Sequence, residues 1–367
     1  MIKEALQEVL QGQDLSYDVA KDTMNKIMDG EVNPIQMGGF LSALALKGES
    51  VEEITAFAEV MRNKAGSVPH GMEVVEIVGT GGDSANTFNI STTSGFVIAA
   101  AGVAVAKHGN RSVSSKCGAA DVVEELGGVL ELDGEQNKEV LTKSGMCFMF
   151  APVYHSSMRY AGPVRKELGV RTVFNILGPL ANPANATIEL MGVYKKEFVE
   201  PLARVLANLG VKRGAVVYGS DGLDEITATG TTYVCEIDNG TFKTYDFDPK
   251  NYGFDYVDAA ELVGGDKVVN ADITRTILSG VIDGKRTAVL LNAGMALYLA
   301  KPGITIEEGI ALAADMIDSG KALEKMNEFI ATTQAVKNKQ DYSVKQILLN
   351  SNHDVVHNDD NYAVQHR

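Results

Sequence analysis

The spacing of the apolar residues changes once along this chain, near residue 73, and that change constrains the fold more than any other feature. Before it, apolar residues recur at helical spacing in four short segments. Asn33 followed by Pro34 is typical of a helix start, and Ser50 with Glu53 forms the capping-box pattern of another. We therefore predict a small all-helical domain over residues 1–72.

From residue 73 onward, short strand-like runs alternate with helix-like segments. The expected strands are residues 73–78, 103–106, 147–150, 188–193, 215–218, 233–237 and 288–291. Helices are expected between them, for example over residues 91–101, 197–209 and 306–317. This alternation favours a central, mostly parallel sheet covered by helices on both faces. The predicted fold class is therefore α/β, with a large α/β domain over residues 73–345 that follows the small helical one.

Composition and charge set further limits. The 367 residues contain no apolar run that approaches the roughly 18 residues of a membrane span, and the start lacks the apolar stretch of a signal peptide, so we expect a cytoplasmic protein. The formal net charge of -15 disfavours nucleic acid or an anionic membrane as a partner. The three cysteines are far apart and form no CxxC pair, so we expect reduced thiols. The tail, residues 346–367, becomes rich in Asn, Asp and His and is expected to be disordered.

A glycine-rich turn, residues 79–83, follows the first expected strand and precedes Asn89-Ile90-Ser91-Thr92 at the start of a helix of small residues. Glycines let the backbone approach an anion, and the amide groups of a helix start point at it. The turn lacks the Gly-Lys-Ser/Thr of a Walker A loop, and Ser84 occupies the third glycine position of a dinucleotide-binding motif. The pattern indicates a phosphate site of another kind, although an ordinary strand-to-helix turn would look the same in isolation.

Two later segments favour the phosphate interpretation. Residues 107–116 combine three cationic side chains, a histidine, an asparagine and three hydroxyls just after an expected strand, which suits a loop around a pyrophosphate better than a solvated charge run. Asp224 and Glu225 also follow an expected strand, where open α/β sheets place their ligands. Carboxylate oxygens suit Mg²⁺ held jointly with phosphates, whereas an acid-rich helix start is the alternative interpretation.

Four basic residues crowd into the segment from residue 155 to residue 179, namely Arg159, Arg165, Lys166 and Arg171. A guanidinium presents a planar fork that fits a carboxylate, whereas a lysine offers only a point charge. Composition alone singles out none of the four.

The order and separation of these segments, together with residues 165–169 (RKELG), closely resemble those of the anthranilate phosphoribosyltransferase family, in the nucleoside phosphorylase-like class. The resemblance runs from the N-terminal helices to about residue 345. It implies a helical domain joined by hinges to the α/β domain, a segment near 160–180 that returns to the helical domain, and a homodimer formed through the helical domain. It further implies that phosphoribosyl pyrophosphate (PRPP) binds between the domains and that, with Mg²⁺ as cofactor, its phosphoribosyl group passes to anthranilate in tryptophan biosynthesis.

The resemblance also assigns the site residues. The PRPP positions are Gly79, Gly82, Asp83, Thr87, Asn89, Ile90, Ser91, Thr92, Lys107, Gly109, Asn110, Arg111, Ser112, Ser115 and Ala119. The Mg²⁺ positions are Ser91, Asp224 and Glu225, and the anthranilate positions are Gly79, His108, Asn110, Arg165 and Pro179. Lys107, His108 and Arg165 are the catalytic candidates. Ala119 departs from the serine of many relatives, and losing one neutral hydrogen bond costs only about 0.5–1.5 kcal/mol.

The implied reaction displaces pyrophosphate from the anomeric carbon by an aromatic amine. Because such an amine is unprotonated at neutral pH, we expect no obligatory general base, and His108 is only a candidate proton acceptor. Catalysis should come from stabilising the departing pyrophosphate through Mg²⁺, Lys107 and the amide groups of the glycine turn. Arg165 would orient the anthranilate carboxylate.

Two other functions remain open from the sequence. A pyrimidine nucleoside phosphorylase would share the two-domain plan and a glycine-rich phosphate loop, but residues 107–115 resemble the transferase. A non-catalytic nucleic-acid-binding relative of the same fold should be basic along its cleft and lack the paired carboxylates, unlike this acidic chain.

Overall fold

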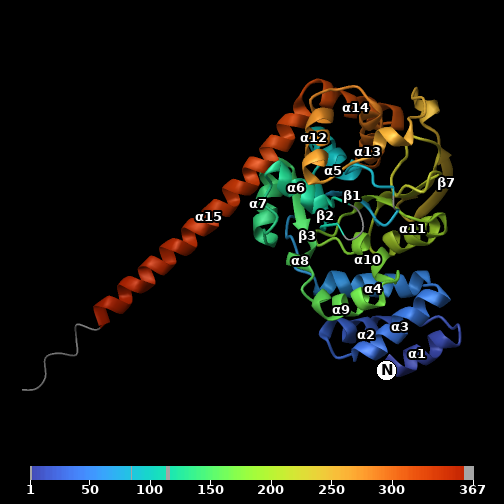
Figure 1. The fold of residues 1–367 in the computed structure, drawn as a ribbon, viewed down its shortest axis with the longest axis vertical. Coiled ribbons are helices and arrows are strands. Elements are labelled where there is room, and N and C mark those ends of the chain that lie inside the picture. The colour runs from blue at the N-terminus through green and yellow to red at the C-terminus, as the bar shows by residue number, and fades with distance from the viewer. Residues whose placement is uncertain (1, 84, 113–115, 359–367) are drawn as a thin grey trace, which may run out of the picture.

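The computed structural model describes residues 2–83, 85–112 and 116–358 of the chain, with side chains as far as residue 340. Its N-terminal part consists of α1 (Ile2–Leu10), α2 (Tyr17–Asp29), α3 (Pro34–Lys47) and α4 (Val51–Lys64). The expected start signals are confirmed, because the Asn33 side chain accepts from the backbone of α3 and Ser50 and Glu53 cap each other's backbone N–H groups at α4. These four helices form the small domain at the blue end of the chain in Figure 1.

A seven-stranded sheet in the order β3-β2-β1-β4-β5-β6-β7 forms the centre of the larger domain. Its strands are β1 (Val75–Gly79), β2 (Val105–Gly109), β3 (Met146–Phe150), β4 (Ile188–Gly192), β5 (Arg213–Gly219), β6 (Thr232–Asp238) and β7 (Thr241–Phe247). The first five strands run parallel, and β6 and β7 complete the sheet as antiparallel strands. The expected α/β class with a mostly parallel sheet is therefore confirmed.

The prediction of a strand at residues 288–291 is wrong, and the sequence analysis predicted no strand where β7 lies. Residues 288–291 lie inside α13 (Gly284–Ala300), a helix buried on nearly all sides, and a fully apolar helix segment has the same local pattern as a buried strand. The missed strand β7 forms a hairpin with β6 through Asn239 and Gly240, both of which have positive φ. Its side chains are mostly exposed, so it carries little of the apolar alternation that marks the other strands.

The remaining helices cover both faces of the sheet. They are α5 (Ile90–Ala100), α6 (Ala119–Leu126), α7 (Gly134–Ser144), α8 (Ala151–Tyr154), α9 (Met158–Leu168), α10 (Phe174–Leu180), α11 (Val199–Asn208), α12 (Lys267–Leu278), α13, α14 (Ile306–Asp318) and α15 (Lys321–Asn358), with short 3-10 turns at Lys196–Phe198, Pro249–Tyr252 and Ala259–Leu262. The end of α15 projects away from the domain (Figure 1). The tail expected to be disordered comprises residues 346–367. Its residues 346–358 form the end of α15, and its residues 359–367 lie outside the described residues.

Two apolar cores hold these layers together. One joins α5 and α13 to their face of the sheet, and the other joins α1–α4 to α9–α11 and to the opposite face of β4, β5 and β6. In the second core α9 packs on α2 and α3, and α10 packs on α4. Residues 158–180 therefore lie between the helical domain and the edge of the sheet where the predicted site lies.

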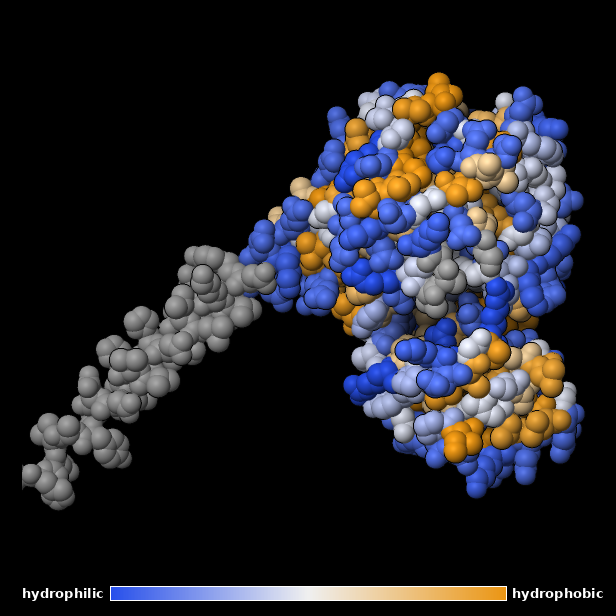
Figure 2. Space-filling model, viewed as in Figure 1, coloured by the Kyte–Doolittle hydropathy of each residue, from blue (hydrophilic) through white to orange (hydrophobic). Residues whose placement is uncertain are grey.

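The surface and the cysteines complete the description. Apolar side chains are exposed on the helical domain (Figure 2), among them Leu10 on α1 and Ile35 and Leu46 on α3. Within the described residues, no helix combines the length and apolar character needed to cross a membrane. All three cysteines are buried, and none forms a disulfide with another described residue.

Candidate active site

Three of the predicted segments meet at one edge of the sheet, where the parallel strands end. The glycine loop, residues 79–83, begins at the last residue of β1. The predicted segment 107–116 begins inside β2, and with Cys117 and Gly118 it forms the basic loop, residues 107–118. Its residues 113–115, which include the predicted Ser115, lie outside the described residues. The acidic pair, Asp224 and Glu225, follows β5 in a loop and not at a helix start. Open α/β sheets bind their ligands at this edge.

The glycine loop and the acidic pair are in direct contact. The Gly81 N–H donates to the Asp224 carboxylate at 2.6 Å. A Cβ atom on Gly79 would lie 2.4 Å from that carboxylate, and one on Gly192 at the end of β4 would lie 1.6 Å from the Asp224 carbonyl oxygen. Gly81 and Gly82 have φ angles of 72° and 79°, which other residues rarely adopt. These positions therefore need glycine so that the backbone can approach the acidic pair.

The negative charge of the acidic pair is only partly balanced by the neighbouring positive groups and hydrogen-bond donors. Burial, together with the neighbouring Asp83 charge, raises the pKa of Asp224 to about 7. Burial and the Asp224 charge raise the pKa of Glu225 to about 8, while Lys107 and the Ser91 N–H, which donates to Glu225 at 3.1 Å, oppose that shift. Asp83 thus lies close enough to the acidic pair for its charge to act on both members.

This arrangement fits a hard divalent cation. Clustered carboxylate oxygens are the donors that Mg²⁺ prefers, and the raised pKa values of Asp224 and Glu225 mark a place where added positive charge is favourable. Within the described part of the chain, no group of three or more His, Cys, Asp or Glu side chains has the geometry of a metal centre by itself. A site in which the protein supplies only some of the ligands is the type that Mg²⁺ shares with phosphates.

Lys107 lies beside the acidic pair. Its side chain is almost fully buried, and its ammonium donates to the Ile77 carbonyl at 2.6 Å and to the Ser91 hydroxyl at 3.2 Å. Burial lowers the pKa of Lys107, whereas attraction to Glu76 and to the acidic pair opposes that effect. Lys107 therefore places a positive charge between the sheet and the start of α5, where an anionic ligand would meet it.

His108, the next residue on β2, points to the other face of the sheet, as alternation along a strand requires. Its backbone N–H donates to the Glu76 carboxylate at 3.0 Å, and its ring lies 5.0 Å from that of His155. Burial, with a smaller contribution from His155, lowers the pKa of His108 to about 3, although the nearby Gly178 carbonyl opposes that shift. His108 is therefore neutral at physiological pH, and the predicted Pro179 follows Gly178 in α10.

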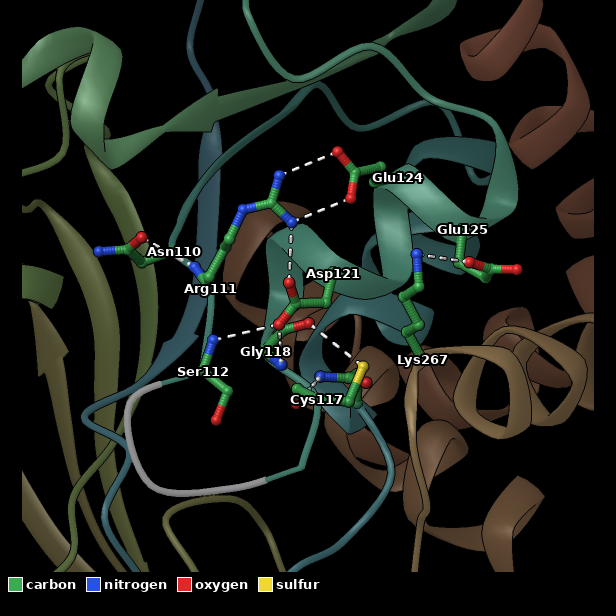
Figure 3. A network of polar contacts seen from close by, with 10 residues as sticks. Asn110, Arg111, Ser112, Cys117, Gly118, Asp121, Glu124, Glu125 and Lys267 are labelled. Carbon is green, nitrogen blue, oxygen red and sulfur yellow. Dashed lines mark hydrogen bonds and ion pairs between the residues drawn. The ribbon is translucent and has the colours of Figure 1, made fainter.

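Asp121 on α6 shapes the described ends of the basic loop (Figure 3). Its carboxylate accepts from the backbone N–H groups of Ser112 at 3.1 Å and Gly118 at 2.9 Å, and it pairs with Arg111 at 2.9 Å. Arg111 also pairs with Glu124 at 2.9 Å, so its charge is already shared by two carboxylates of α6. These contacts draw the two ends of the loop together.

The remaining PRPP positions surround the start of α5. The Asn89 side chain donates to the Cys117 carbonyl at 3.3 Å and accepts from Asn270 at 2.9 Å, which joins the start of α5 to the basic loop and to α12. Thr92 is buried, and its hydroxyl has no hydrogen-bond partner among the described residues. The other positions are Thr87, which forms a β-bridge with Val263, the buried Ile90, Gly109 at the end of β2, Asn110 at the surface, and Ala119 at the start of α6.

Arg165 comes from α9, outside the sheet. Its guanidinium lies 5.2 Å from the Phe174 ring centroid, burial lowers its pKa, and it forms no ion pair with a described acidic residue. It is therefore available to an anion, and it lies on the segment between the helical domain and the sheet edge.

Sequence reasoning missed two polar residues that organise the site. Glu76 is completely buried on β1 and accepts from His108 and from the Asn182 side chain. A glutamate in the middle of an apolar strand was a visible signal of such a role. Asn270 is buried on α12, and no local pattern distinguishes it from other helix residues.

The two parts of the fold match two domains of one family. Residues 3–65 match the helical bundle domain, and residues 71–323 match the a/b domain, of the glycosyl transferase family. The fold and the site thus define a glycosyltransferase of this two-domain type.

Individual relatives narrow this class. The anthranilate phosphoribosyltransferase of Lachnoclostridium phytofermentans is 53% identical over 330 residues, which cover 90% of this chain and 98% of that protein. The crystal structure of the Thermus thermophilus enzyme is 41% identical, with a TM-score of 0.85 and coverage of 90% of this chain and 99% of that one. The Saccharomyces cerevisiae enzyme in complex with PRPP and Mg is 27% identical, with a TM-score of 0.83 and coverage of 91% and 98%. This chain belongs to the anthranilate phosphoribosyltransferase family.

Proposed function

We propose that this protein transfers the phosphoribosyl group of PRPP to the amino group of anthranilate, giving N-(5-phosphoribosyl)anthranilate and pyrophosphate in tryptophan biosynthesis. One structural observation supports this proposal in addition to family membership. The glycine loop, Lys107 and the acidic pair meet at one sheet edge, where Gly81 contacts Asp224 and Lys107 contacts Ser91. Amide donors, an ammonium and carboxylates in one place suit a diphosphate and its cation on an otherwise acidic protein.

PRPP would bind across the glycine loop, the start of α5 and the basic loop. The backbone N–H groups at the start of a helix attract anions, and the Thr92 hydroxyl, which has no partner among the described residues, supports a ligand there. Arg111 would contribute less than its charge suggests, because Asp121 and Glu124 already neutralise it. Ser91, Asp224 and Glu225 would hold Mg²⁺, which when bound would neutralise charge that develops on pyrophosphate.

Anthranilate would bind on the side of α9 and α10. Arg165 is a half-buried guanidinium without an acidic partner among the described residues, which suits a carboxylate. His108 and Pro179 would line the approach of the aromatic ring, with Gly79 and Asn110 on the PRPP side. Two neutral imidazoles, His108 and His155, face this region without adding charge.

The reaction would need little help from a general base. The nitrogen of anthranilate carries a free lone pair at neutral pH, and a group whose pKa is about 3, such as His108, holds a proton poorly there. The described residues would act instead by orientation, with Arg165 on the carboxylate, and by charge, with Lys107 beside the leaving group. The proton released from the amine would pass to water or to the departing pyrophosphate.

The test is to follow the loss of anthranilate fluorescence with PRPP and Mg²⁺, omitting each in turn. Turnover that requires all three supports the proposal, and no turnover with all three present would overturn it. Phosphorolysis of thymidine or uridine without PRPP would indicate a pyrimidine nucleoside phosphorylase. A salt-dependent gel shift with DNA or RNA would indicate a nucleic-acid-binding protein.

We further propose that the protein forms a homodimer through its helical domain and works in the cytoplasm. The exposed Leu10, Ile35 and Leu46 on α1 and α3 support a self-association surface, and three buried cysteines without a disulfide among the described residues support a reducing compartment. Light scattering after gel filtration tests the dimer. A monomer at micromolar concentration, or a dimer unaffected by Ile35→Glu with Leu46→Glu, would contradict it.

A further inference from the structure

Arg171 links the α9–α10 segment to the glycine loop. It lies between α9 and α10, which pack on the N-terminal helices, yet its guanidinium donates to the Gly82 carbonyl in the glycine loop. A Cβ atom added to Gly82 would lie 3.3 Å from that guanidinium, so the glycine loop and the arginine are in close contact.

Tyr194, which follows shortly after the end of β4, stacks its ring on the face of the same guanidinium. The Arg171 guanidinium carbon lies 4.0 Å from the ring centroid of Tyr194, a stacking distance at which cation and ring attract. The Tyr194 backbone N–H donates to the Thr80 hydroxyl at 3.2 Å, and the Thr80 N–H donates to the Gly192 carbonyl at 3.0 Å. Arg171 and Tyr194 therefore act together on the start and the middle of the glycine loop.

Three consecutive residues of the glycine loop thus have three different anchors. Thr80 is held by the end of β4, Gly81 by Asp224, and Gly82 by Arg171. The first two anchors belong to the α/β domain, whereas the third comes from the segment that packs on the helical domain. A movement between the two domains would therefore leave the first two contacts in place and change the contact at Gly82.

We propose that Arg171 is a positioning residue that couples the α9–α10 segment to the glycine loop, so that PRPP binding and anthranilate binding strengthen each other. The inference rests on the proposed function, because it places PRPP at the glycine loop and the anthranilate carboxylate at Arg165, six residues before Arg171 on the same segment. A ligand that holds this segment through Arg165 also holds Arg171 against Gly82, and the second ligand then meets a glycine loop that is already fixed in place. Such coupling is reciprocal by thermodynamic necessity.

The kinetic test compares Arg171→Ala with Arg159→Ala, a matched arginine on the same segment that stacks on its neighbour Tyr160. Arg171→Ala should raise KM for PRPP about tenfold while kcat changes by less than about threefold, because a contact to a charged donor is lost without loss of a reacting group. Arg159→Ala should behave like the wild type. Equal effects of the two substitutions, or an unchanged KM for PRPP in Arg171→Ala, would overturn the inference.

A binding experiment tests the coupling itself. Calorimetry would measure the affinity of PRPP with Mg²⁺ in the presence and absence of benzoate, which carries the carboxylate of anthranilate but lacks the amine and cannot react. Benzoate should tighten PRPP binding to the wild type and to Arg159→Ala, but not to Arg171→Ala. The same tightening in Arg171→Ala would overturn the inference.

Two further variants keep the test decisive. If Arg171→Ala does not fold, Arg171→Lys replaces it. Because lysine keeps a hydrogen-bond donor but lacks the planar face that stacks on Tyr194, this variant should have a KM for PRPP between those of the wild type and Arg171→Ala. Tyr194→Leu should raise KM for PRPP, and the double variant with Arg171→Ala should lose less than the product of the two single effects. Failure of the proposed function is distinct from all these outcomes, because the wild type itself would then show no turnover of anthranilate with PRPP.

Discussion

Glu76 on β1 and Glu189 on β4 are register partners in the middle of the sheet, and both side chains are completely buried. Glu76 accepts from the backbone of His108 and from Asn182, whereas the carboxyl oxygens of Glu189 have no hydrogen-bond partner among the described residues. Burial raises the pKa of Glu76 to about 8, and burial with the Glu76 charge raises the pKa of Glu189 well above its usual value. Arg62 of α4 is the positive group whose charge opposes the shift at Glu189.

The Glu189 carboxyl predicts a pH dependence of stability. A carboxyl group whose pKa is higher in the folded state takes up a proton on folding, so stability falls as pH rises from the unfolded value, near 4.5, through the folded value. Glu189→Gln removes this proton uptake, so the stability of the variant relative to the wild type should rise between pH 5 and pH 8, by at most about 1.4 kcal/mol per pH unit. Urea unfolding at several pH values measures it. Identical pH slopes for the two proteins would contradict a raised pKa of Glu189.

The role of Arg165 predicts a selective loss of one substrate. Arg165→Ala should raise KM for anthranilate by about tenfold to a hundredfold, the usual effect of losing a charge-assisted hydrogen bond of roughly 1.5–3 kcal/mol, and should raise KM for PRPP far less. Lys166→Ala, at the exposed neighbouring position, is the control. Equal losses for both substrates would show that Arg165 does not hold the anthranilate carboxylate.

The buried Lys107 predicts a loss in kcat. Lys107→Met keeps the length of the side chain but removes the charge beside Ser91 and the acidic pair, and kcat should fall by about 10²–10³-fold. Lys116→Met, an exposed lysine of the same basic loop, should retain activity. Circular dichroism would verify that the first variant folds, and a folded Lys107→Met enzyme with normal kcat would remove Lys107 from the mechanism.

The acidic pair predicts the metal requirement. Asp224→Asn combined with Glu225→Gln should abolish Mg²⁺-dependent turnover, because the amides lack the charge that binds a hard cation. Removing Mg²⁺ from the wild type with a chelator should have the same effect, and added Mg²⁺ should reverse it. Calorimetric titration of Mg²⁺ with PRPP present would check binding separately from activity. Undiminished turnover in the double variant would remove the metal assignment.

Local sequence signals predicted much of this molecule. Helix starts at Asn33 and Ser50 and the glycine loop were readable because caps, turns and positive φ angles depend on a few neighbouring residues. The same reasoning failed at residues 288–291, because a short apolar run is the same in a buried helix and a buried strand. It also missed the exposed strand β7, which lacks apolar alternation.

The sequence by itself determined which chemical groups this protein carries and most of the elements on which they lie, since both depend on covalent order and local backbone preference. Only the tertiary structure decided which of these groups meet. It placed Glu76 beside Glu189 and paired Arg111 with the carboxylates of α6. It also brought Arg171, one of the basic residues of its segment, into contact with the Gly82 carbonyl. Such contacts join residues far apart in the chain, and they are selected by the packing of whole helices and strands, which no local pattern records.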